Sequence, residues 1–377
     1  MYALHFIFNA VLFFIIKGKM NTTGENKGFS LNLISQYRKE LFGIAILLIM
    51  FFHFAQIHVD FYGNGHTIGF LFTRGFYRYI GSAGVEMFVL LSGVGLYYSF
   101  SANGNIGRFY KRRYNRILIP YAIVGGIYWL YSDIIRTNNG VERWIQDSFY
   151  ITFIREGVNN FWFILFIGCM YLIFPAIYKG MYDKSYGSVF AVVSFATAVV
   201  IPAIISTYSP DIYKNIEIAL TRVPLFILGT GMGRSIKENK HMPYVAIGML
   251  IAAGTGCRYY AVAADIKGYA ARYASGLLGI ALILIFTYSI HFLRIRALLR
   301  RVLRFFGRYS LEFYLLHVAM WGMFAQAGIP MHRSSRYMTM VVITIILAPL
   351  LSAVTGRIGD IKAVRKKFSR IVQKSML

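Results

Sequence analysis

His53 is an ionisable side chain in a strongly apolar part of the chain. It follows nine consecutive apolar residues, 44–52, and polar residues return only at Gln56. If a helix begins near Leu41, a rise of about 1.5 Å per residue places His53 about 18 Å along it, past the centre of a ~30 Å hydrocarbon core. Imidazole takes up and releases protons near neutral pH, so His53 is our candidate general base. The alternative is an interfacial histidine whose ring nitrogens bond to water or to a carbonyl.

Two more ionisable residues, Glu86 and Arg222, occur inside apolar stretches. Glu86 comes early in a predicted helix, where a carboxylate is costly unless it is paired or hydrated. It could orient an imidazole or hold a substrate hydroxyl, or it could form a salt bridge with a structural arginine. Arg222 lies close to Pro224 in a later apolar run. The positive-inside rule explains arginines in loops and not one inside an apolar run. The position of Arg222 therefore favours a polar cavity beside it.

A basic cluster of Arg112, Arg113 and Arg116 follows the second apolar run, in the stretch FYKRRYNRILIPY. The planar guanidinium group matches the geometry of phosphate, so the cluster could bind a phosphate-bearing ligand. The alternative is a topological signal, because cytoplasmic loops of membrane proteins concentrate Lys and Arg. Both interpretations predict a cytoplasmic position.

Polar groups also occur in the stretch FGRYSLEFYLLH, where Ser310 can cap a helix that carries Glu312, Tyr314 and His317. Positions 310, 314 and 317 share one helical face by their spacing, and Glu312 lies off that face. These residues are either a second polar group of the site or a capped helix start. Trp162, at the expected interface before another apolar run, is a further supporting residue.

The cysteines and the acidic residues predict no metal site. Cys169 and Cys257 both lie in apolar segments and have no C-x-x-C spacing, which is typical of buried small hydrophobic residues. No His/Cys/Asp cluster has the spacing of metal ligands. We therefore expect no metal and no permanently bound cofactor.

The elements that must position these residues are membrane helices. The chain has 377 residues, of which 57% are hydrophobic and 15% are charged, and its mean hydropathy is +0.54. Soluble domains are typically about 45–50% apolar and about 25% charged. Apolar runs of ~20 residues, enough to cross a bilayer, predict an all-α integral membrane protein with about ten transmembrane helices. The expected spans are 40–59, 82–100, 117–135, 161–178, 188–206, 217–233, 243–264, 273–290, 309–326 and 338–356.

The formal net charge of +25 is explained by topology and does not require a nucleic-acid partner. With the N-terminus inside, 28 of the 40 Lys and Arg residues fall in cytoplasmic segments, as expected from the positive-inside rule. We therefore predict that both termini are cytoplasmic. The expected location is a cell membrane, the inner or plasma membrane of a bacterium, with lipids as partners and without nucleic acid.

We divide the chain into three parts. Residues 1–34 form a short apolar segment and a polar linker, residues 35–357 form the transmembrane domain, and residues 358–377 form a basic cytoplasmic tail. The tail suits contact with anionic headgroups, at about 1 kcal/mol per charge.

Four blocks, ELFGIAILLIMFFH, GVEMFVLLSG, FYKRRYNRILIPY and FFGRYSLEFYLLH, occur in this order. Together they resemble the acyltransferase 3 family of integral-membrane acyltransferases over 35–357. The resemblance implies transfer of an acyl group from acyl-CoA to a hydroxyl of a carbohydrate or cell-surface glycan. The expected acyl group is acetyl. In a direct transfer, His53 would remove the proton of the acceptor hydroxyl as it attacks the thioester; the alternative is a transporter-like relay, if donor and acceptor meet the membrane from opposite sides. Arg112, Arg113 and Arg116 would bind the phosphates of the co-substrate acyl-CoA.

The chain departs from the family pattern at Phe42, where the first helix of the family commonly has an arginine. Arg38 lies one turn earlier; either it takes over that role or this chain works without it. Two rival functions are a polysaccharide transporter or flippase and a membrane glycosyltransferase. We find no two-half repeat, which a transporter would favour, and no D-x-D motif.

Overall fold

The computed structural model describes residues 28–63, 65–293 and 296–375, with side chains up to residue 358. The short apolar segment predicted at the start of residues 1–34, and most side chains of the predicted tail, lie outside the described residues. Nearly all of the described chain is helical, so the prediction of an all-α membrane protein is confirmed.

Nine segments of the described chain are long and apolar enough to span a membrane, where the sequence predicted about ten. The predicted span at 309–326 is the difference, because its helix has only 17 residues, about 26 Å against a ~30 Å core. The nine are Arg38–Tyr62 (α3), Ala83–Ser101 (α5), Ile106–Arg136 (α6, Ile106–Trp129, and η2, Leu130–Arg136), Trp162–Tyr182 (α9), Gly187–Tyr208 (α10), Pro210–Lys237 (α11, Pro210–Leu220, and α12, Val223–Lys237), Tyr244–Ala263 (α13), Gly268–Phe292 (α14) and Ser334–Ile358 of α17 (Ser334–Ser375).

Shorter elements connect these spans. They are β1 (Phe29–Ser30), which pairs antiparallel with β2 (His241–Met242), α2 (Asn32–Gln36), α4 (Ile68–Tyr79), α7 (Gly140–Ser148), α8 (Ile151–Glu156), α15 (Ala297–Arg308) and α16 (Ser310–Gln326).

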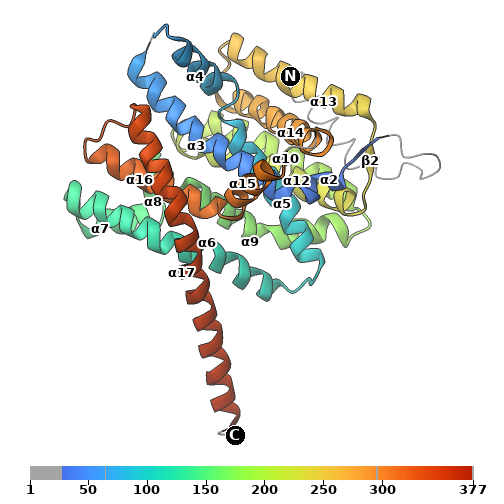
Figure 1. Cartoon of the computed structure of the whole chain (residues 1–377). Helices are drawn as coiled ribbons and strands as arrows, with labels where there is room; N and C mark the ends of the chain where they lie inside the picture. Colours follow the sequence, from blue (N-terminus) through green and yellow to red (C-terminus); the bar gives the residue numbers. More distant parts are fainter. Residues whose placement is uncertain (1–27, 64, 294–295, 376–377) are drawn as a thin grey trace.

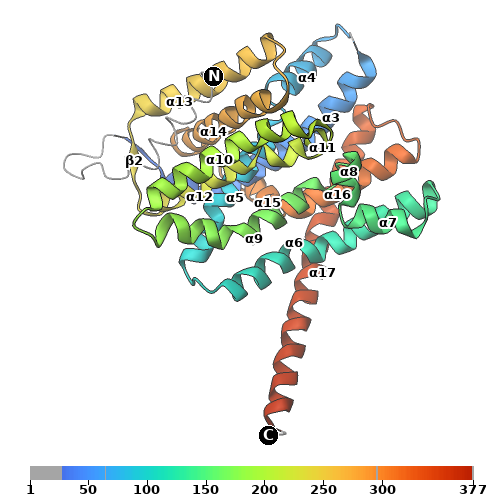
Figure 2. The same cartoon turned by 180° about the vertical axis from the view of Figure 1, so that it is seen from behind.

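Helix α5 is the centre of the bundle, where it packs against α3, α12 and α14. Helices α13 and α14 lie together on one side of it, and α6, α16 and α17 lie on the other (Figure 1). The view from behind shows α9, α10 and α12 side by side, and α17 projecting beyond the bundle at its C-terminal end (Figure 2).

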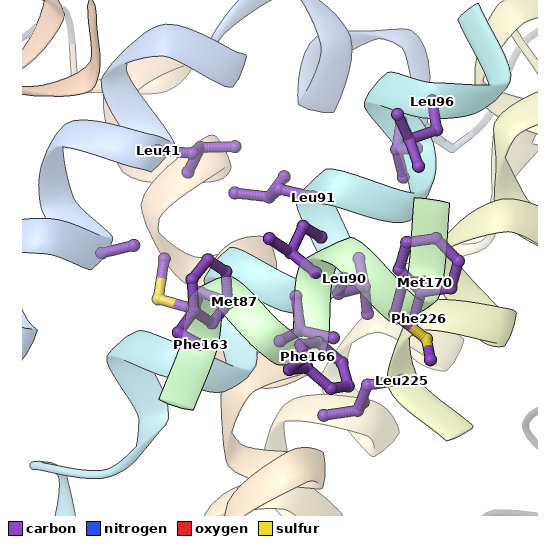
Figure 3. Packing of buried hydrophobic residues seen from close by; sticks show 14 of the residues in the cluster. Leu41, Met87, Leu90, Leu91, Leu96, Phe163, Phe166, Met170, Leu225 and Phe226 are labelled. Atoms are coloured by element: carbon purple, nitrogen blue, oxygen red, sulfur yellow. The ribbon is translucent and has the colours of Figure 1, made fainter. Parts of the chain in front are cut away.

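Apolar side chains of α5, α9 and α12 interlock in the core (Figure 3). Glycines bring the backbones close: a Cβ at Gly229 of α12 would lie 2.2 Å from the carbonyl oxygen of Leu90, and one at Gly93 would lie 2.5 Å from that of Phe226. Small residues commonly permit such approach between membrane helices. This contact fixes the start of α5, which carries Glu86, against the start of α12, which follows Arg222.

Candidate active site

A cavity of about 470 Å³ opens among α3, α5, α9, α14 and α16, beside the C-terminal half of α3. This volume is within the range of small-molecule sites. Aromatic rings and a few polar groups form its wall. Of the predicted site residues, the cavity wall contains His53, Trp162, Arg222 and Tyr314.

The imidazole of His53 lies in this wall among other rings. Its centroid is 5.0 Å from that of Trp321 and 5.2 Å from that of His317. The Nδ1 atom is buried and has no hydrogen-bond partner among the described residues. The residue itself lines the cavity, and a neutral imidazole in that position can accept a proton from a bound group.

His317 of α16 lies behind His53 and is fully buried. Its Nδ1 is 3.0 Å from the carbonyl oxygen of Phe313. A carbonyl can only accept, so Nδ1 carries a hydrogen, and in the neutral ring Nε2 keeps a lone pair. That Nε2 atom also has no partner within the described chain. The fold thus joins two predicted site residues, far apart in sequence, as neighbouring imidazoles.

Glu86 pairs with Arg222 rather than with an imidazole. One carboxylate oxygen lies 2.8 Å from a guanidinium nitrogen, and each residue is only 2% exposed. The Arg222 guanidinium lies over the ring of Trp162, 5.1 Å from its centroid. Of the interpretations considered for Glu86, the structure shows the salt bridge with an arginine, and Arg222 faces the cavity.

Tyr314 contributes to the same wall and supports the start of α9. Its hydroxyl accepts a hydrogen bond from the Phe163 amide at 3.3 Å. The neighbouring Asn160 donates to the hydroxyl of Tyr128 at 3.0 Å. These bonds hold the first turn of α9, with Trp162, against the cavity.

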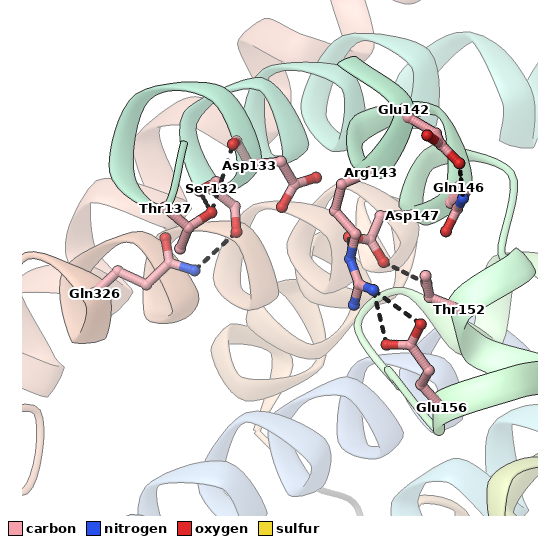
Figure 4. Close-up of polar contacts among 10 residues, drawn as sticks. All are labelled: Ser132, Asp133, Thr137, Glu142, Arg143, Gln146, Asp147, Thr152, Glu156 and Gln326. Carbon is pink, nitrogen blue, oxygen red and sulfur yellow. Dashed lines mark hydrogen bonds and ion pairs between the residues drawn. The ribbon is translucent and has the colours of Figure 1, made fainter. Parts of the chain in front are cut away.

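The segment that leads into α9 is held by charged contacts (Figure 4). Arg143 of α7 bonds to Asp147 at 3.0 Å and to Glu156 of α8 at 2.9 Å, and Thr152 donates to Asp147. This network joins α7 to α8, a few residues before Asn160. It therefore helps to fix one side of the cavity.

Tyr77, Arg272 and Trp321 also line the cavity and were not singled out from the sequence. Trp321 is four residues after His317, so extension of the Tyr314–His317 face along α16 would have found it. Arg272 is an arginine in an apolar helix, the same signal that identified Arg222. Only the fold could bring Tyr77 here, because α4 is not a span.

Tyr77 stacks on Phe52 of α3, with ring centroids 5.3 Å apart. Burial raises the pKa of the Tyr77 phenol above its usual value, and the Asp60 carboxylate raises it further. The hydroxyl therefore stays protonated at neutral pH and can donate a hydrogen bond into the cavity.

The remaining predicted residues, Arg38, Glu312 and the three arginines of α6, do not line the cavity. Arg116 forms a two-pronged pair with the buried Glu312, at 2.5 and 3.0 Å. This pairing explains the position of Glu312, which lies off the helical face shared by Tyr314 and His317. It also engages the guanidinium group of Arg116.

Arg38 and Arg113 retain unused donors at the other end of α3. Arg38 lies over the Tyr98 ring, and Arg113 lies over Phe109. Arg38 Nη1 and Arg113 Nε are buried without a partner in the described chain. The fifteen residues from Arg38 to His53 correspond to about 22 Å of helix, so the two ends of α3 present separate sites.

Comparison with known proteins finds one family. The model of an acyltransferase domain, Acyl_transf_3, matches residues 43–355. This range includes His53, Glu86, Arg222 and His317 and excludes Arg38. No curated protein and no solved structure matches significantly.

Proposed function

The chain belongs to the acyltransferase 3 family and is a multi-pass membrane acyltransferase, and we propose that it transfers an acetyl group from acetyl-CoA to a hydroxyl of a carbohydrate or cell-surface glycan. The observation that carries this proposal is the unpartnered imidazole of His53 in the wall of a cavity of about 470 Å³. Aromatic rings and side-chain amides in the same wall suit the apolar faces and hydroxyls of a sugar.

In the proposed reaction, the acceptor hydroxyl oxygen attacks the thioester carbonyl and His53 takes its proton. The carbon–sulfur bond then breaks, and the thiolate of coenzyme A leaves and is protonated. A neutral imidazole is suited to this step because hydroxyl groups are poor nucleophiles until a base removes the proton. Tyr77 and Arg222 are hydrogen-bond donors in the same wall.

The proposed donor site is at the opposite end of α3, where Arg38, Arg112 and Arg113 would bind the phosphates of acyl-CoA. Arg116 is engaged by Glu312 and would contribute through its charge. A donor bound there has to extend its thioester along α3 to reach His53. The excess of Lys and Arg at this end supports a cytoplasmic orientation for it. The cavity would then receive its acceptor from the other face of the membrane.

Sided membrane vesicles test the reaction and the orientation together. Inside-out vesicles of a bacterial host should transfer label from added acetyl-CoA to a glycan fraction, whereas sealed right-side-out vesicles should not. Transfer only by right-side-out vesicles would contradict the orientation. Absence of transfer from both, with host glycan present, would contradict the proposed donor and acceptor.

Arg112→Gln/Arg113→Gln should raise the KM for acetyl-CoA about tenfold or more, since a hydrogen bond to a charged group contributes about 1.5–3 kcal/mol. The kcat should change little because these residues lie far from His53. Arg301→Gln, an exposed arginine of α15, is the matched control for loss of positive charge. If the double variant inserts normally and its KM for acetyl-CoA is unchanged, these arginines do not bind the donor and serve only as a topological signal.

A further inference from the structure

The charged side chains in the cavity wall are of one sign. The wall contains Arg222 and Arg272, and none of its described lining residues is Asp or Glu. The carboxylates that pair with these arginines, Glu86 and Glu217, lie outside the lining. The arginines therefore present their positive groups to the cavity while their counter-ions lie behind them.

Three helices add positive potential because they begin at this cavity. Ser82 precedes α5, Trp162 is the first residue of α9, and Arg222 precedes α12, and all three line the wall. A helix N-terminus carries about half a positive charge and favours an anion nearby.

Arg222 and Arg272 keep donors for such an anion. Glu86, the Trp162 ring and the Ile218 carbonyl oxygen surround the Arg222 guanidinium. Its Nε remains without a partner among the described residues, in a side chain that is almost completely buried. Arg272 uses its Nε on Glu217 at 3.1 Å, and its two terminal nitrogens make no hydrogen bond within the described chain. Arginine donors of this kind bind carboxylate and phosphate groups strongly.

We propose that the acceptor is an anionic carbohydrate, whose carboxylate or phosphate binds Arg222 and Arg272 while one of its hydroxyls faces His53. This inference rests on the proposed function and names its acceptor class. A neutral sugar offers only hydroxyl and ring oxygens to these guanidinium groups, whereas a carboxylate or phosphate forms stronger, charge-assisted hydrogen bonds with them. Trp162 and Trp321 flank the site and offer ring faces for the sugar.

Binding can be measured without any acyl donor, so the outcome is independent of acyl transfer. Trp162 and Trp321 line the cavity, and quenching of tryptophan fluorescence reports its occupancy in the purified protein. We expect glucuronic acid or glucose 6-phosphate to bind at least about tenfold more tightly than glucose. The two anions distinguish a carboxylate site from a phosphate site.

Arg272→Gln should remove this preference, because it deletes the more accessible arginine and leaves the buried Glu86–Arg222 pair intact. Arg155→Gln, an exposed arginine of α8 outside the cavity wall, should keep it. Equal binding of glucose and both anions would overturn the proposal. Quenching by coenzyme A alone, lost in Arg272→Gln, would also overturn it, since the arginines would then serve the donor.

Discussion

His53→Gln should lower acetyl transfer by about 10²–10⁴-fold, the usual loss when a general base is removed. Glutamine keeps a hydrogen-bonding group of similar reach but cannot accept a proton at neutral pH. The neighbours of His53 are rings, those of Trp321 and His317, so the change removes no hydrogen bond that the described structure shows. The measurement is label transfer from acetyl-CoA, normalised to the amount of protein in the membrane.

His58→Gln is the matched control for the His53 prediction. His58 lies five residues further along α3, outside the cavity wall, and its Nδ1 is 3.4 Å from the His332 carbonyl oxygen. Its substitution should leave transfer close to the parent rate. If His53→Gln retains more than about a tenth of the parent rate, the imidazole is not the base and only fills the wall beside Trp321.

The parts of this structure that the sequence predicted are those set by local pattern. Spans follow from runs of apolar residues, and the shared face of Tyr314 and His317 follows from their spacing in one helix. The run predicted at 309–326 is present as α16, Ser310–Gln326, one residue shorter than expected. Helix ends are defined only to within one or two residues, so the sequence located this helix, and its short length alone separates it from the nine spans.

Pairings across the bundle could not be read from the sequence. Glu86 and Arg222 are distant along the chain, and the sequence left open whether the carboxylate would meet an imidazole or an arginine. The glycine contacts between α5 and α12 decide this, because they set these two helices against each other. In the same way, the spacing predicts that Glu312 lies off the helical face shared by Tyr314 and His317. Its partner, Arg116, can be identified only from the packing of α6 against α16.

Glu86→Gln should lower the free energy of unfolding by about 3–5 kcal/mol, because it leaves the Arg222 charge buried without its counter-ion. Both side chains are almost completely buried at a separation of 2.8 Å, so water cannot replace the lost carboxylate. The measurement is thermal unfolding of the detergent-purified protein, followed by size-exclusion chromatography. An unfolding temperature equal to that of the parent would contradict a buried, charged pair.

The double variant Glu86→Gln/Arg222→Gln separates the structural role of the pair from its role in the cavity. Two neutral amides leave no uncompensated charge, so the double variant should be more stable than Glu86→Gln alone. Acetyl transfer should nevertheless remain low, because the cavity wall has lost the guanidinium that faces the substrate. If the double variant regains both stability and transfer, the pair serves only to join α5 to α12. If it regains stability alone, Arg222 acts on the substrate and Glu86 acts by holding that arginine in place.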